Sequence, residues 1–139
     1  MDLPAEYGIL YTCDLFCDDQ PQPVNVRDKR LISIPYSLEM NDIIVYNSYQ
    51  EPPRRYAEML KTNFDQLYED GAENGTVMCI PLHPYAVGRP HRINAFEEAL
   101  EYITGHDEVW VTTGREIAEY FYDHHYDKAV ASIAEANGR

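Results

Sequence analysis

Short apolar runs rich in strand-favouring residues divide the chain. They cover residues 8–13, 31–35, 77–82 and 109–113. Most lack the alternation of apolar and polar positions that is typical of a strand with one solvent-facing side. Continuous apolar runs of this length predict strands buried on both faces, as in a parallel sheet covered by helices.

Helical spacing marks the stretches that follow the later runs. Residues 54–68 and 92–103 carry apolar side chains three and four positions apart, and a glycine follows each stretch. A third stretch opens with Thr113 and Glu116, the S/T-x-x-E order in which both side chains satisfy free backbone amides. The resulting order of strand and helix predicts an α/β fold with parallel strands joined by crossover helices.

Composition and charge narrow the classes of function. The 139 residues suffice for one domain, and 45% hydrophobic with 25% charged residues is ordinary for a globular protein. We expect no membrane partner and a cytoplasmic protein, since no long apolar run or signal peptide is visible. A net charge of −13 argues against nucleic acid as partner, because phosphates would be repelled. The acidic residues are scattered, which is typical of a solvated surface.

Cysteine and tyrosine add little to this picture. Cys13 and Cys17 form a C-x3-C pair without a second pair, so packing is favoured over a metal role. The 12 tyrosines suit a polar cleft of sugar or ring size, and they suit the edge of a core equally well.

Polar residues gather after the predicted strands, where α/β folds build their active sites. Asp14, Asp18 and Asp19 follow the first run, and their mutual repulsion calls for a cation, an arginine or hydrogen bonds. Two aspartates before a proline are also a common turn. His83 ends the third run, a position suited to proton transfer, although a single histidine also serves structural roles.

Three segments match a known pattern when they are taken together. They are Asp14 with Asp18-Asp19-Gln20-Pro21, then Ile34-Pro35-Tyr36-Ser37-Leu38-Glu39-x-Asn41-Asp42, then Leu82-His83-Pro84-Tyr85-x-x-Gly88-x-Pro90-His91-Arg92. The set resembles the polysaccharide deacetylase family, and more closely its branch of allantoinase-like and peptidoglycan-deacetylase-like enzymes. The resemblance runs from about Tyr7 to about Tyr126. It implies the C-terminal half of a distorted (β/α) barrel, a single partial domain over residues 1–139.

The resemblance also implies a chemistry. Family members hydrolyse amide-type C–N bonds, by removing an acetyl group from an amino sugar or by opening a cyclic amide, with the help of a divalent metal, usually zinc. His83 would act as the general acid, with Asp14 and Asp19 as further catalytic residues. The residues expected to line the substrate, a small molecule or an amino sugar, are Asp18, Gln20, Tyr36, Glu39, Asn41, Tyr85, His91 and Arg92.

The metal is the main departure from the family pattern. Its ligands in the family lie in early motifs, and neither T-x-x-x-D-D nor H-x-x-x-H occurs in this chain. The stretch 123–127 contains ligand-type residues, but the adjacent His124 and His125 would point about 100° apart on a helix. A solvent-facing helix end is therefore favoured there. Pro81 is a second departure, since the family usually has an aliphatic residue at that position.

The missing ligands leave several interpretations open. In the first interpretation, the chain is part of a metal-dependent C–N hydrolase that needs the N-terminal half or another chain. A homo-oligomer is a further alternative within this interpretation. Alternatively, it is a non-catalytic remnant acting as a binding or subunit module. The third interpretation is an unrelated α/β domain whose motifs match by chance.

Overall fold

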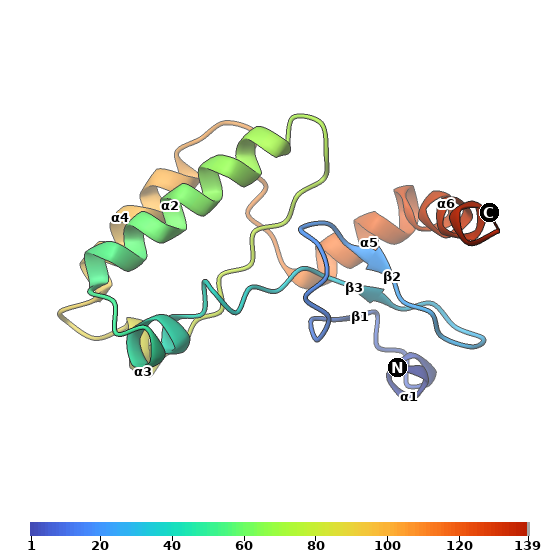
Figure 1. The fold of residues 1–139 in the computed structure, drawn as a ribbon, viewed down its shortest axis with the longest axis horizontal. Helices are drawn as coiled ribbons and strands as arrows, with labels where there is room; N and C mark the ends of the chain where they lie inside the picture. The colour runs from blue at the N-terminus through green and yellow to red at the C-terminus, as the bar shows by residue number, and fades with distance from the viewer. Residues whose placement is uncertain (139) are drawn as a thin grey trace. The chain divides into compact units, whose positions relative to one another are not determined.

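The computed structural model describes residues 1–138 and divides the chain into two compact units. The first unit combines Met1–Pro35 with Thr112–Arg139, and the second unit is Tyr36–Val111. Figure 1 labels the helices and strands of both units.

The first unit contains a small mixed sheet. Its strands are β1 (Tyr11–Thr12), β2 (Gln22–Pro23) and β3 (Ile32–Ser33), in the order β1-β3-β2. β1 and β3 pair in parallel, which confirms the parallel pairing expected of the first two apolar runs. β2 pairs antiparallel with β3 and lies in a connection expected to be irregular, so the sheet is mixed rather than parallel.

Helices α1 (Asp2–Glu6), α5 (Gly114–His124) and α6 (Tyr126–Asn137) complete the first unit. The capping box of α5 is confirmed: Glu116 N–H donates to Thr113 Oγ1 at 3.3 Å, and Thr113 N–H donates to Glu116 Oε2 at 3.0 Å. The Tyr122 hydroxyl donates to the Leu10 carbonyl at 2.7 Å and so joins α5 to the sheet. The stretch predicted as a helix end is the junction of α5 and α6.

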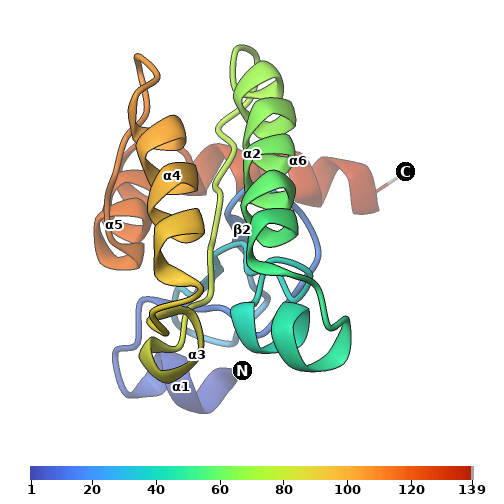
Figure 2. The ribbon, with the colours of Figure 1, turned by 90° about the vertical axis from the view of Figure 1, so that its left-hand side faces the viewer.

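The second unit is built around two long helices, α2 (Pro53–Asp70) and α4 (Ile93–Thr104). They lie side by side in both views (Figure 1, Figure 2), and Gly71 and Gly105 cap their C-terminal ends. The short π-helix η1 (Ile44–Ser48) and the short helix α3 (Pro84–Val87) supply further core residues. The buried core consists of Met40, Val45, Tyr46, Tyr56, Ala57, Leu60, Val87, Phe96 and Ala99. Both predicted helices of this unit are thereby confirmed.

Two predicted strands do not form among the described residues. Residues 77–82, the extended yellow-green segment between α2 and α3 in Figure 1, belong to no strand, and neither do residues 109–113. A strand is defined by the neighbouring strand that its N–H and C=O groups bind, and within residues 1–138 neither segment pairs with another strand. The fold is therefore α/β, mostly helical with a small mixed sheet, and its strands are not joined by crossover helices.

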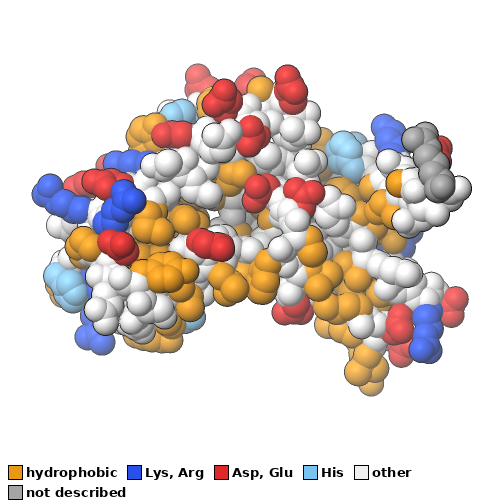
Figure 3. Space-filling model, in the orientation of Figure 1, with side chains coloured by type: hydrophobic (Ala, Val, Ile, Leu, Met, Phe, Trp, Pro, Cys, Tyr) orange, Lys and Arg blue, Asp and Glu red, His pale blue; other side chains and the backbone are white. Residues whose placement is uncertain are grey.

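Two surface properties follow from the side chains. Acidic groups occur across the face drawn in Figure 3, as expected of a solvated surface. Among the described residues, no helix combines the length and the apolar character needed to cross a membrane.

Candidate active site

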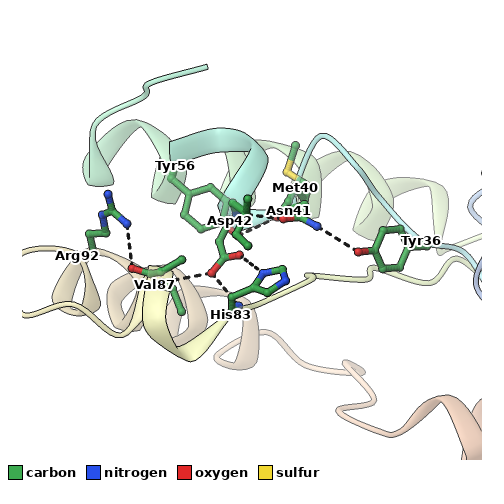
Figure 4. A network of polar contacts seen from close by, with 10 residues as sticks. Tyr36, Met40, Asn41, Asp42, Tyr56, His83, Val87 and Arg92 are labelled. Carbon is green, nitrogen blue, oxygen red and sulfur yellow. Dashed lines mark hydrogen bonds and ion pairs between the residues drawn. The ribbon is translucent and has the colours of Figure 1, made fainter. Parts of the chain in front are cut away.

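The second unit holds a buried aspartate against the histidine that the sequence singled out. The His83 ring atom Nδ1 lies 2.7 Å from Asp42 Oδ1, and the His83 backbone N–H donates to Asp42 Oδ2 at 2.8 Å. The Val87 N–H donates to the same oxygen at 3.2 Å. Asp42 is 0% exposed, and Figure 4 shows its carboxylate between the His83 ring and the turn that carries Val87.

The local sequence explains how Asp42 reaches this position. Asn41 Oδ1 accepts from the Ile43 N–H at 3.0 Å, a short-range bond that turns the backbone at the start of the following helical segment. The Asp42 N–H donates to the Pro81 carbonyl at 3.2 Å, two residues before His83. Backbone and side chain of Asp42 are thus both bonded to the segment that carries the histidine.

The surroundings of the carboxylate are apolar and aromatic. The Tyr56 hydroxyl donates to the Met40 carbonyl at 2.8 Å. Burial, together with the negative charge of Asp42, raises the pKa of the Tyr56 hydroxyl above its usual range. Burial likewise raises the pKa of Tyr46, whose ring lies 4.0 Å from the Arg92 guanidinium. In such surroundings an ionised carboxylate depends on the hydrogen bonds that it accepts.

His83 combines a fixed end with an accessible one. Its side chain is 34% exposed while that of Asp42 is 0% exposed. Figure 4 shows the second ring nitrogen, Nε2, on the far side of the ring from Asp42. An ionised Asp42 accepts a hydrogen bond from the Nδ1–H group of His83. The other ring nitrogen, Nε2, is then available to exchange a proton with a bound molecule. The exposed ring of Tyr85 lies 5.5 Å from the His83 ring, centroid to centroid.

The other residues predicted for this unit have varied surroundings. The Asn41 side chain donates to the Tyr36 hydroxyl at 3.1 Å, and the Ser37 hydroxyl lies 3.4 Å from the exposed Glu39 carboxylate. Arg92 donates to the Ala86 carbonyl at 3.0 Å and braces the turn that holds Val87. His91 is exposed in the turn before α4, which begins one residue later than the sequence indicated.

The acidic residues predicted after the first apolar run belong to the first unit. Asp14 accepts from the Thr12 hydroxyl at 2.5 Å. Asp18 accepts from the Asp19 N–H at 2.7 Å and from the Gln22 side chain at 2.8 Å. These bonds describe a local turn at the surface, and the catalytic and binding roles of Asp14, Asp18, Asp19 and Gln20 stay predictions.

Asp42 is the residue that the sequence interpretation missed. It lies in one of the three matching segments, but the sequence pattern assigns it no role. A signal was present, because the apolar residues Ile43, Ile44 and Val45 directly follow this carboxylate. An acidic residue in such a context is buried only with hydrogen-bonding partners, and a histidine is a suitable one.

The described residues do not fit the metal that the resemblance implies. Within residues 1–138 no group of three or more His, Cys, Asp or Glu side chains is arranged to hold a metal ion. Asp42 and His83 supply two such side chains, and the hydrogen bonds above already engage both oxygens of Asp42. The pair is therefore better suited to proton transfer with a bound molecule than to holding a metal ion.

Comparison with known proteins finds relatives that this chain resembles over part of their length. No family model matches the chain. A putative polysaccharide deacetylase of Schizosaccharomyces pombe is 32% identical over 134 residues, a match that covers 86% of this chain and 41% of that protein. The crystal structure of a probable polysaccharide deacetylase from Pseudomonas aeruginosa PAO1 matches with 33% identity and a TM-score of 0.81, and covers 86% of this chain and 41% of that one.

A third relative extends the likeness to allantoinase. The crystal structure of the Puue allantoinase matches with 35% identity and a TM-score of 0.81 over 86% of this chain and 41% of that one. The fold is therefore that of proteins named deacetylase and allantoinase. Over the matched length the chain is similar to members of the polysaccharide deacetylase family, an allantoinase among them, and the resemblance seen in the sequence is confirmed. It spans less than half the length of the relatives that it matches.

Proposed function

We propose that this chain contributes the proton-transfer part of an enzyme that hydrolyses C–N bonds other than peptide bonds. The observation that carries the proposal is the 2.7 Å contact between His83 Nδ1 and the buried Asp42. The substrate would be an N-acetylated amino sugar or a small cyclic amide, because the relatives are named for deacetylation and for allantoin hydrolysis. The complete site would also need residues that this chain does not supply, from the N-terminal part of the family fold or from another chain.

In the proposed reaction His83 is the general acid. After water has added to the carbonyl carbon, the imidazolium of His83 would donate the Nε2 proton to the nitrogen as the C–N bond breaks. The nitrogen is then released as a neutral amine or, in a cyclic substrate, as a neutral N–H group of the opened ring. Asp42 is a positioning residue in this scheme. It fixes the ring through Nδ1 and stabilises the positive imidazolium, while two backbone N–H groups hold the carboxylate in place.

The test is a chimera in which the matched part of the Puue allantoinase is replaced by this chain. We expect hydrolysis of allantoin or of an acetylated amino-sugar oligomer. The His83→Ala chimera should lose activity by about 100-fold or more, as removal of a general acid does. The matched control is His124→Ala, an exposed histidine at the end of α5, which should retain most of the activity. Full activity of the His83→Ala chimera would contradict the proposal.

A non-catalytic binding or subunit module is the second candidate. It is favoured by the lack of an assembled group of metal-ligand side chains within residues 1–138. In that case the chimera would bind an amino-sugar oligomer or allantoin in calorimetry without turning it over. Substitution of His83 would then change affinity only.

A further inference from the structure

We propose that Arg92 is a positioning residue that acts on His83 from a distance, through one peptide group and the buried carboxylate of Asp42. The Arg92 guanidinium donates to the Ala86 carbonyl at 3.0 Å. The N–H of the same peptide group belongs to Val87, and it donates to Asp42 Oδ2 at 3.2 Å. The other oxygen of Asp42 lies 2.7 Å from His83 Nδ1, so a continuous chain of polar contacts joins the arginine to the histidine (Figure 4).

The charge of Arg92 acts on the middle of this chain. A charged donor on the carbonyl polarises the peptide group, so that the N–H at its other end becomes a stronger donor. The Val87 N–H is shared between the His83 carbonyl at 3.1 Å and the Asp42 carboxylate at 3.2 Å. A more positive hydrogen gains most from the charged acceptor, so Arg92 favours the bond to the ionised Asp42.

An aromatic ring holds the Arg92 side chain in place. The guanidinium carbon lies 4.0 Å from the centroid of the Tyr46 ring, and Tyr46 is only 7% exposed. The Tyr46 hydroxyl has no hydrogen-bond partner among the described residues, so the face of the ring makes the contact. Burial raises the pKa of Tyr46, the charge of Arg92 lowers it and the charge of Asp42 raises it. Arginine and aspartate therefore both lie within electrostatic reach of this ring.

The position of Arg92 in the fold suits such a role. It directly precedes α4, which packs against α2 in the second unit, and it is half-buried. Within residues 1–138 it forms no ion pair, so no carboxylate contact neutralises the charge that acts on the peptide group. The effect of Arg92 on turnover rests on the proposed function, whereas the chain of contacts does not.

Arg89 provides a matched control on the same short helix. It is exposed, and its Nε donates to the Tyr85 carbonyl at 2.9 Å. The N–H of that peptide group belongs to Ala86 and donates to the His83 carbonyl at 2.8 Å rather than to Asp42. Arg89→Gln therefore removes a charged donor from the neighbouring peptide group and leaves the chain from Arg92 intact.

The first measurement is nuclear magnetic resonance of the whole chain. In the native chain we expect a coupling through the hydrogen bond between the Val87 amide nitrogen and the Asp42 carboxylate carbon. Arg92→Gln should lose this coupling, and Arg89→Gln should keep it. Arg92→Lys retains a charged donor without the planar group that stacks on Tyr46, so its coupling should be intermediate. A native chain without the coupling, or a coupling unchanged in both Arg92 variants, would overturn the positioning role.

The second measurement is steady-state kinetics of the chimera. Arg92→Gln should lower kcat by about tenfold or more and leave KM within about twofold, because a misplaced acid slows the chemical step without weakening substrate binding. Arg92→Lys should lower kcat less, and Arg89→Gln should change neither constant. A raised KM with unchanged kcat in either Arg92 variant would show that the arginine contacts the substrate, and would overturn the positioning role. The lysine variant keeps the test decisive if Arg92→Gln unfolds.

The two measurements separate the role of Arg92 from the proposed function. An inactive chimera, together with loss of the coupling in Arg92→Gln, would contradict the function and support the positioning role. A chimera that needs His83 but keeps full kcat in Arg92→Gln would overturn the positioning role and leave the function supported.

Discussion

Two aspartates of this chain, Asp42 and Asp18, accept hydrogen bonds from backbone and side chain in very different settings. Asp42 is fully buried, and its partners His83 and Val87 lie more than forty positions away in the sequence. Asp18 is exposed, and its partners are the next residue and one four positions away. The bonds of Asp42 fix two separate segments, whereas those of Asp18 shape a local turn that water could satisfy as well.

The difference shows which of the two carboxylates is held in a fixed position. A buried charge is costly without partners, so the geometry around Asp42 tolerates little change. An exposed charge is screened by water and salt, and its contacts contribute little. The sequence interpretation assigned roles to the exposed aspartates through the family resemblance, while the structure brings together the pair that includes Asp42.

The largest effect is expected from Asp42→Ala. This change leaves the N–H groups of His83 and Val87 without their acceptor, so the free energy of unfolding should fall by roughly 3 kcal/mol. Urea unfolding measures the loss. Asp18→Ala is the matched control and should cost less than about 1 kcal/mol. Equal losses in the two variants would remove the distinction between the two aspartates.

A smaller effect should separate two buried tyrosines near Asp42. The Tyr56 hydroxyl donates to the Met40 carbonyl at 2.8 Å, whereas the Tyr46 hydroxyl is buried without a hydrogen-bond partner among the described residues. Tyr56→Phe should therefore lower the free energy of unfolding by about 1 kcal/mol. Tyr46→Phe should leave it unchanged or raise it, because it removes an unsatisfied polar atom. Thermal unfolding of the two variants in the same buffer measures both changes. A larger loss of stability in Tyr46→Phe than in Tyr56→Phe would contradict the expectation.

The smallest effect concerns Glu116, an exposed carboxylate with well-defined partners. Hydrogen bonds from Thr112 and Thr113 hold the pKa of Glu116 below its usual 4.5. A depressed folded-state pKa stabilises the protein above the unfolded pKa, and this contribution is lost as the pH falls through the folded value. Stability should decline below about pH 4.5, and Glu116→Gln should flatten that part of the profile. An identical acid profile in the variant would show that the cap carries no pH dependence.

Helices α2, α4 and α5 were the most predictable part of the fold, whereas α1, α3 and α6 were not predicted. The spacing of Tyr56, Leu60, Phe64 and Leu67 fixes a buried face, and a capping box or a terminal glycine marks the ends, so local sequence suffices. The strands at 77–82 and 109–113 were wrong because strand formation depends on a partner, which the local sequence does not contain. The burial predicted for residues 109–113 was also wrong, since Trp110 is 58% and Val111 is 73% exposed.

Of the two residues that form the site, the sequence predicted His83 but not Asp42. His83 was found because its neighbours match a sequence motif of the family. In the structure it follows an extended segment, as expected. Asp42 was missed because its role depends on a contact across 41 positions, which single-sequence patterns do not report.

The measurement that tests the account most directly is the tautomer of His83, read from the nitrogen chemical shifts of its ring near neutral pH. The account predicts that the proton of the neutral ring resides on Nδ1 in the native chain, because Asp42 accepts it. In Asp42→Asn the amide can donate to Nδ1, so the proton should move to Nε2. A native ring protonated on Nε2, or one unaffected by Asp42→Asn, would contradict the claim that Asp42 positions His83 for proton transfer.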